Sequence, residues 1–356
     1  MAGQPRLKRP TIVDVAQRAG VSHTTVSFVI NGVASAGITA ETRDRVLKAI
    51  TELDYHPHAG ARSMGRRSSL TIGVAIPDSV NSHYHEIVAG IETYAAEHGY
   101  SVLLSSTNFD ATRELRSFEW LKQQQVDGLI LIPSTPTGHA AELETARRRG
   151  QPIVILGPAH PDVDTVQPEA LSGEQQVLDH LAQLGHRRIG YIYGVADHHV
   201  YGERLAACLE IQQGLGLPVV ERWVRRCGPT VEDGYQATQA LLADCAPDDR
   251  PTALVVVNDL LGAAVIAALT EAGLRVPAQI SVATFDNTIH ARYTVVPRLT
   301  SVDYEAHALG AQAARLLIER LADPQRPPAH VVTPARLVVR QSTGIAAAWQ
   351  DHKMTR

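Results

Sequence analysis

The sequence predicts an α + α/β protein, in which a small three-helix module at the N-terminus precedes an α/β body of two lobes. Residues 11–57 hold three short helical patterns separated by turn residues. From residue 70 onward, apolar strand patterns alternate with helical ones, which is typical of parallel sheets covered by helices. This alternating part is too long for one comfortable α/β core, so we expect two lobes.

The composition is that of a globular protein. Apolar residues make up 44% and charged residues 20% of the chain. The longest apolar stretch, residues 260–269, is too short to span a bilayer, and the basic N-terminus lacks the apolar segment of a signal peptide. The three cysteines form no Cys-x-x-Cys pair. We therefore expect a reduced, cytoplasmic protein without a membrane partner.

Charge is distributed unevenly between the two parts. Residues 1–70 carry ten Lys or Arg residues and five acidic residues. The remainder of the chain carries 23 Lys or Arg residues and 32 acidic residues. A basic module on an acidic body indicates that only the module meets a polyanion. The alternative is that a small domain varies by this much without functional meaning.

Residues that favour the start of a helix and residues that favour its end alternate along the N-terminal module. Thr11 is suited to cap a first helix that ends at Gly20, and Ser22 to cap a second that ends at Asn31. A third helix follows Thr39, with an apolar stripe of Val46, Leu47, Ile50 and Leu53. Three short helices with a glycine turn between the first two form a helix-turn-helix pattern, whose second helix enters the DNA major groove.

The second helix places an aromatic residue on a polar face. Val26 and Val29 fall on the side expected to be buried, whereas Phe28 falls among polar side chains. Its ring can contact a thymine methyl group in the major groove. The alternative is that it packs on the first helix and completes a small core. The residues of this module that we expect at the DNA are Thr11, Ser22, His23, Thr24, Thr25, Ser27, Phe28 and Asn31.

In the body, we expect strands at residues 70–76, 102–104, 128–132, 152–156, 188–192, 253–257 and 280–285, with helices at 85–98 and 111–124. Ligands bind beyond the carboxyl ends of such strands. Polar residues follow several of these ends, namely Asp78, Ser79, Asn258 and Asp286, and Arg204 lies near a helix start. Carboxylates and an Arg at a cleft suit a polyhydroxylated ligand. Asp259 is expected to cap the following helix instead.

Enzyme motifs are missing from the sequence. It has no Gly-x-Ser-x-Gly, no phosphate-binding loop and no His-Glu-x-x-His, and the glycines at 214 and 216 lack a third partner. His83-x-His85-Glu86 and His198-His199 could be read as metal ligands, but adjacent histidines arise by chance in a chain with 16 of them. We expect no catalytic residue, cofactor or metal.

Eight segments together resemble the lactose-repressor (LacI-type) family of bacterial transcription regulators. They occur in the family's order: TIVDVAQRAGVSHTTVSFVING, TRDRVLKAITELDYHPHAGARSMG, LTIGVAIPDSVNSHY, VDGLILIP, LGHRRIGYI, VVVNDLLGAAVIAAL, GLRVPAQISVATFDN and PRLTSV. The resemblance implies a helix-turn-helix DNA-binding domain and hinge, then a body like the periplasmic sugar-binding proteins, whose chain crosses between lobes three times.

On this basis we expect a DNA-binding domain at 1–57, a hinge at 58–69, a body at 70–346 and a tail at 347–356. Lobe 1 would comprise about 70–163 and 290–325, and lobe 2 about 164–289 and 326–346, with crossings near 163, 290 and 325.

In the hinge, the resemblance implies that Met64 wedges into the minor groove, where the family has Leu. Arg62, Arg66 and Arg67 would contact phosphates, so that affinity falls with salt. The alternative for this segment is a flexible basic linker.

The family's effector-binding Arg and Asp correspond to Arg204 and Asp286, with Asn258 beside them. The full expected set is Asp78, Ser79, His83, Tyr84, Arg204, Asn258 and Asp286. This chain departs from the family pattern at His83, which replaces an aromatic residue, and at Glu169 and Ala170, where an Asp-Asn pair is usual. The scaffold is kept while the pocket differs.

We therefore expect a transcription regulator, a repressor, that binds a near-palindromic operator as a homodimer under control of a sugar or sugar derivative. The C-terminus lacks the leucine heptads of the family's tetramers. A purine or nucleoside effector is the alternative. A solute-binding protein without DNA function would need an export signal and would not need residues 1–60. Induction and corepression are opposite signs of one coupling, and the sequence leaves the sign open.

Overall fold

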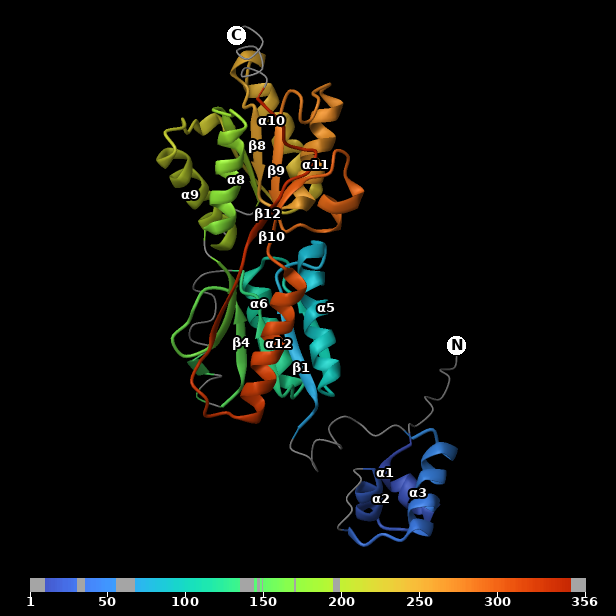
Figure 1. The fold of residues 1–356 in the computed structure, drawn as a ribbon. Helices are drawn as coiled ribbons and strands as arrows, with labels where there is room; N and C mark the ends of the chain where they lie inside the picture. Colours follow the sequence, from blue (N-terminus) through green and yellow to red (C-terminus); the bar gives the residue numbers. More distant parts are fainter. Residues whose placement is uncertain are drawn as a thin grey trace, which may run out of the picture. The chain divides into compact units, whose positions relative to one another are not determined.

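The computed structural model describes residues 10–30, 36–55, 68–134, 144–145, 148, 150–169, 171–194 and 199–346. The chain divides into two compact units, Met1–Leu70 and Thr71–Arg356 (Figure 1). Of the hinge predicted at 58–69, only residues 68 and 69 are among those described, and the tail at 347–356 lies outside them.

The first unit packs three helices around a small apolar core: α1 (Ile12–Ala19), α2 (His23–Ile30) and α3 (Ala40–Glu52). Val15, Val26 and Val46 are fully buried in it. Leu47 was expected in this core but is 48% exposed, and Ala49 is buried in its place. The reason is geometric: one residue advances a helix by about 100°, so Val46 and Ala49 share a face that Leu47 does not.

The first sheet of the second unit is wholly parallel, with strand order β11-β5-β4-β3-β1-β2. Its strands are β1 (Thr71–Ile76), β2 (Ser101–Ser106), β3 (Gly128–Leu131), β4 (Ile153–Leu156), β5 (Asp164–Pro168) and β11 (His330–Thr333). Helices α5 (Ser82–Glu97), α6 (Ala111–Gln123) and α12 (Ala306–Ala322) pack on it. This sheet and its helices are lobe 1.

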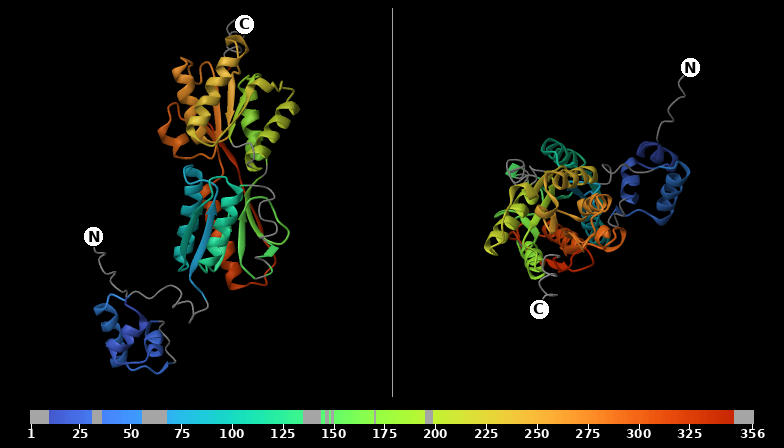
Figure 2. Two further views of the ribbon diagram at one scale, coloured as in Figure 1. Left: turned by 180° about the vertical axis from the view of Figure 1, so that it is seen from behind. Right: turned by 90° about the horizontal axis from the view of Figure 1, so that it is seen from above.

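The second sheet has the order β12-β10-β9-β8-β6-β7 and is parallel except for β12, which pairs antiparallel with β10. Its strands are β6 (Ile189–Gly194), β7 (Val224–Cys227), β8 (Ala253–Val256), β9 (Ser281–Phe285), β10 (Thr300–Asp303) and β12 (Arg336–Val338). Its helices are α8 (Ser172–Gln183), α9 (His199–Gly214), α10 (Val231–Asp244) and α11 (Asp259–Glu271), with short turns η2 (Glu221–Trp223), η3 (Pro247–Asp249) and η4 (His290–Thr294). Figure 2 shows this lobe 2 and lobe 1 as separate layered bodies.

Sheet membership corrects the predicted lobe boundaries. β5 pairs with β4 in lobe 1, so the first crossing lies at residues 169–171 rather than near 163. β10 pairs with β9 in lobe 2, which moves the second crossing from 290 to 304–305. β11 pairs with β5, which moves the third from 325 to 334–335. β5 and β10 each pair with the strand that precedes them in the chain, whereas β11 pairs with β5, far earlier in the sequence. Local patterns do not reveal which of these pairings forms.

Helices α5 and α12 lie against each other at backbone contact. A Cβ atom on Gly90 would stand 2.0 Å from the carbonyl oxygen of His307, and one on Gly310 would stand 1.9 Å from that of Ile87. Only glycine permits this approach. None of the helices in the described part of the chain has the length and apolar character needed to cross a membrane.

Candidate functional site

The exposed side of α2 carries the side chains that we expect to contact DNA. His23 and Thr24 are exposed, and Thr25 and Ser27 are half-buried. Phe28 is 39% exposed and is not part of the apolar cluster that α1, α2 and α3 enclose. The structure thus does not support the alternative in which Phe28 completes this core, and an apolar ring stands on a polar helix face.

Three hydroxyl residues in this set stabilise helix starts. The Thr11 Oγ1 accepts from the Asp14 backbone N–H at 3.4 Å, and the Asp14 carboxylate accepts in return from the Thr11 N–H at 2.7 Å. The Ser22 Oγ accepts from the Thr25 N–H at 3.1 Å, with the two hydroxyls 2.9 Å apart. The Thr11 hydroxyl already donates its one proton to the Asp14 carboxylate at 2.7 Å, whereas one hydroxyl of the Ser22–Thr25 pair keeps its proton for a phosphate oxygen.

The remaining predicted DNA contacts lie outside the described residues. These are Asn31, Arg62 and Met64. The minor-groove wedge therefore stays a prediction.

In the body, the predicted residues that follow β1 form the turn before α5. The Asp78 carboxylate accepts from the backbone N–H groups of Val80 and Asn81 at 2.8 and 3.1 Å. Ser79 is exposed. Asp78 therefore fastens the turn, and Asn81 in turn caps α5 by accepting from the His83 N–H at 3.0 Å.

The start of α5 meets Asp286 of lobe 2. The Asn81 amide donates to the Asp286 Oδ2 at 3.4 Å, and the His83 Nδ1 lies 3.8 Å from the Asp286 Oδ1. Asp286 is 6% exposed, and His83 Nδ1 is buried without a hydrogen-bond partner. Asp286 has φ +97°, a conformation rare for residues other than glycine and frequent at ligand sites. Asn81, which was not among the predicted site residues, takes part in this contact while it caps α5.

A chain of hydroxyl and amide groups continues this contact. The Tyr84 hydroxyl donates to the Tyr201 hydroxyl, which also accepts from the Asn258 amide. Burial raises the pKa of Tyr84 well above its ordinary value and that of Tyr201 to about 12. Tyr201, which sequence reasoning did not select, joins α5 of lobe 1 to α11 of lobe 2.

Arg204 lies in the cleft, as predicted, but much of its hydrogen-bonding capacity is used within the protein. Its guanidinium donates to the Glu174 carboxylate at 3.0 Å, to the Val257 carbonyl at 3.0 Å and to the Tyr304 hydroxyl at 3.1 Å. It also stacks 4.5 Å from the centroid of the Phe285 ring. Of the five N–H donors of an Arg, two are left for a ligand.

The cap of α11 is Asn258 rather than the neighbouring Asp259, which the sequence predicted as the cap. Asn258 caps α11, since its Oδ1 accepts from the Leu261 N–H at 2.9 Å. The carboxylate of Asp259, expected to be the cap, is fully buried and accepts from the hydroxyls of Thr284 and Ser301 and from the Thr288 N–H. It thereby fixes the loop that carries Asp286.

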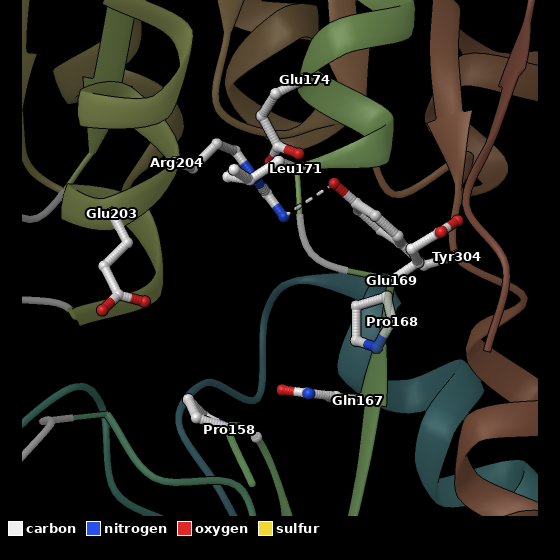
Figure 3. A pocket seen from close by; sticks show the side chains of 10 residues that line it. Pro158, Gln167, Pro168, Glu169, Leu171, Glu174, Glu203, Arg204 and Tyr304 are labelled. Carbon is white, nitrogen blue, oxygen red and sulfur yellow. Dashed lines mark hydrogen bonds and ion pairs between the residues drawn. The ribbon is translucent and has the colours of Figure 1, made fainter. Parts of the chain in front are cut away.

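Arg204 also borders an open pocket between the lobes, with a cavity of about 160 Å³ (Figure 3). Its lining comes from the ends of β4 and β5, from α8 and α9, and from the crossing segments: Gly157, Pro158, Gln167, Pro168, Glu169, Leu171, Glu174, Glu203, Arg204 and Tyr304. The pocket lies at the carboxyl ends of parallel strands, where α/β proteins hold ligands. In the described part of the chain, no three His, Cys, Asp or Glu side chains are grouped to hold a metal ion.

Family models match both parts of the chain. Residues 11–58 match the bacterial regulatory proteins of the lacI family, and residues 178–343 match a periplasmic binding protein-like domain. These assignments coincide with the helix-turn-helix unit and with most of the second sheet.

Curated and solved relatives extend over nearly the whole chain. The HTH-type transcriptional repressor PurR of Pasteurella multocida is 34% identical over 93% of this chain and 98% of its own length, and that of Mannheimia succiniciproducens is 33% identical over the same shares. The Lac repressor dimer bound to operator and the anti-inducer ONPF has a TM-score of 0.79 and 29% identity, covering 95% of this chain and 100% of that one. The regulator CelR in complex with cellobiose has a TM-score of 0.68 and 30% identity, covering 94% and 100%. The chain therefore belongs to the lacI family of bacterial regulatory proteins and is a DNA-binding transcriptional repressor.

Proposed function

We propose that this repressor binds a near-palindromic operator as a homodimer, and that a small molecule held between its lobes changes its operator affinity. The observation that carries the proposal is the meeting of Arg204, Asp286 and the start of α5 at the edges of the two sheets. A ligand placed there touches both lobes, so it favours one angle between them. That angle then alters how two DNA-binding units address one operator.

Three exposed apolar side chains that are close in the sequence of lobe 2 support the homodimer. Tyr293 and Val296 are 70% and 84% exposed, and Ile289 is exposed beside them in sequence. Exposed apolar side chains that lie together mark protein interfaces. A twofold dimer would present two helix-turn-helix units to two half-sites, as the solved Lac repressor dimer on its operator illustrates.

For the effector, we favour a purine-type molecule over the sugar that the sequence suggested. Relatives that align over 98% of their length carry the name PurR. The rings of His83 and Tyr84, 5.5 Å apart between centroids, lie next to Asp286, an arrangement suited to a flat ring with N–H donors. A sugar is the second candidate, since CelR was solved with cellobiose.

Two contacts between the lobes would couple ligand binding to lobe angle. Asn81 donates to Asp286, and the Arg292 guanidinium pairs with the Glu86 carboxylate. A ligand that hydrogen-bonds Asp286 competes with the first contact, because a carboxylate has a limited number of acceptor sites. The equilibrium between lobe arrangements then moves by the difference in ligand affinity for the two states.

The test begins with selection of DNA from a random pool by the full chain. We expect enrichment of an inverted repeat, and a footprint that covers two half-sites about one or two helical turns apart. Operator affinity is then measured at fixed salt with adenine, guanine, hypoxanthine, adenosine, cellobiose and glucose. A change of roughly fivefold or more with one of them supports the proposal. Failure to enrich any sequence would contradict the operator, and unchanged affinity with all six would contradict this choice of effectors.

A further inference from the structure

The pocket between the lobes carries more negative than positive charge. Among the described residues that line it, three are acidic, Glu169, Glu174 and Glu203, and one is basic, Arg204. The formal charge of these described lining residues is therefore −2. In the view of Figure 3, Glu203 lies on the left and Glu169, next to Pro168 and Tyr304, on the right.

The positive charge of Arg204 is already neutralised inside the protein. Its side chain and that of Glu174 are both only 9% exposed, and they pair at 3.0 Å. Burial lowers the pKa of Arg204, but Tyr304, Glu174 and Asp286 raise it well above its ordinary value, so the charge is permanent. An anionic ligand would be left with the two remaining N–H groups of Arg204, and its charge would face the carboxylates of Glu174, Glu169 and Glu203 without a further cation among the described lining residues.

A further carboxylate stands close to the same guanidinium. Asp286 is buried and acts electrostatically on Arg204, and among the described residues its carboxylate has a long hydrogen bond from Asn81 at 3.4 Å and the His83 Nδ1 at 3.8 Å. A buried carboxylate with such weak partners retains acceptor capacity. The cleft therefore offers acceptors from both sides of Arg204 and little free positive charge.

We infer that the effector of this repressor bears an amine, either an ammonium or an exocyclic amino group, and carries no phosphate or carboxylate. Glu203 and Glu169 would accept from the amine at the pocket mouth. Pro158, Pro168 and Leu171 supply apolar surface beside these carboxylates, against which the rest of the ligand can pack. This inference rests on the proposed function, because it assumes that the effector enters this cleft.

Two matched series of compounds test the inference by thermal melting of the full chain. The first is adenosine, inosine and adenosine monophosphate, and the second is glucosamine, glucose and glucose 6-phosphate. Within at least one series, we expect the amine to raise the melting midpoint at roughly tenfold lower concentration than its oxygen analogue, with no shift from the phosphate. A tighter-binding phosphate, equal binding of amine and oxygen analogue, or no shift with any of the six compounds overturns the inference.

Variants at the pocket mouth connect the preference to its cause. Glu203→Gln and Glu169→Gln keep side-chain size and remove the charge. Each should weaken binding of the amine roughly tenfold and leave binding of the oxygen analogue unchanged. Glu210→Gln is the matched control, since Glu210 is an exposed residue of α9 that does not line the pocket. Equal losses for both compounds, or a loss with Glu210→Gln, would contradict the assigned role.

Operator binding separates this inference from the function on which it rests. A phosphorylated compound that changes operator affinity leaves the proposed function intact and removes the amine preference. Conversely, an amine that raises the melting midpoint without changing operator affinity supports the amine preference of the pocket and contradicts the proposed control of DNA binding.

Discussion

Phe28 exposes its ring on α2 beside the exposed side chains of His23 and Thr24. Replacing it by Ala removes apolar surface that DNA would cover, which corresponds to about 1 kcal/mol for a ring that is already half-buried. Phe28→Ala should therefore lower operator affinity roughly fivefold in fluorescence anisotropy titrations. The melting midpoint of the chain should stay the same.

Leu47→Ala is the control for Phe28→Ala. Leu47 is also an exposed apolar residue of the same unit but lies on α3, outside the predicted recognition helix. Its replacement should leave operator affinity unchanged. Equal affinity of the Phe28→Ala variant and the wild type would remove Phe28 from the DNA interface.

The role of Asp259 could not be predicted from the sequence. Asn258 and Asp259 are adjacent, and either could cap a helix. Which one does so depends on the backbone conformation one residue before α11, where Asn258 is extended. The partners of Asp259, Thr284 and Ser301, are distant in the sequence, so its role as an acceptor at the centre of lobe 2 follows only from the fold.

Burial raises the pKa of Asp259 from 3.8 to about 7. Between these values the folded protein binds more protons than the unfolded chain. The contribution of this group to the free energy of unfolding is therefore greatest at low pH and falls as pH rises from about 4 to about 7, by up to about 1.4 kcal/mol per pH unit. Urea denaturation at pH 5, 6 and 7 should show a steeper fall for the wild type than for Asp259→Asn. Parallel profiles would contradict this assignment.

Seven strands of the body were predicted close to where they lie, whereas β5, β7, β10, β11 and β12 were not predicted and the assignment of segments to lobes was partly wrong. The predicted strands agree with β1, β3, β8 and β9 within two residues, because buried parallel strands are continuous apolar runs bounded by turn residues. β10 and β11 were assigned to the wrong lobes. Each is four residues long, and its local sequence is compatible with either sheet: β10 pairs with the preceding strand β9, whereas β11 pairs with β5, far earlier in the chain.

The contact between α5 and α12 depends on two glycines. Gly310→Ala places a methyl group against the Ile87 carbonyl, so the helices must separate. We expect a loss of about 1 to 3 kcal/mol in the free energy of unfolding, measured by urea denaturation. Gly214→Ala in α9 is the control, since no atom lies within 4 Å of a Cβ built there, and Ala is the better helix former. Unchanged stability of Gly310→Ala would mean that the helices are not in backbone contact.

At the scale of the whole molecule, the two lobes meet through side chains that the sequence placed in one ligand site. Asp286, Arg204, Asn258 and Tyr84 were predicted from strand ends and from the family resemblance, and the structure brings them to the cleft. The effector itself was not predictable, because the two residues that differ from the family pattern act through neighbours that only the fold brings close: His83 beside Asp286, and Glu169 in the lining of the pocket.

The most direct test of the account is the operator affinity of the full chain, with and without the panel compound that raises its melting midpoint most, compared between wild type and Asp286→Asn. If occupancy of the cleft controls DNA binding, the compound should change wild-type affinity by roughly fivefold or more and should leave the affinity of the variant unaltered. A response that persists in the Asp286→Asn variant would place the controlling ligand outside the cleft and contradict the central claim.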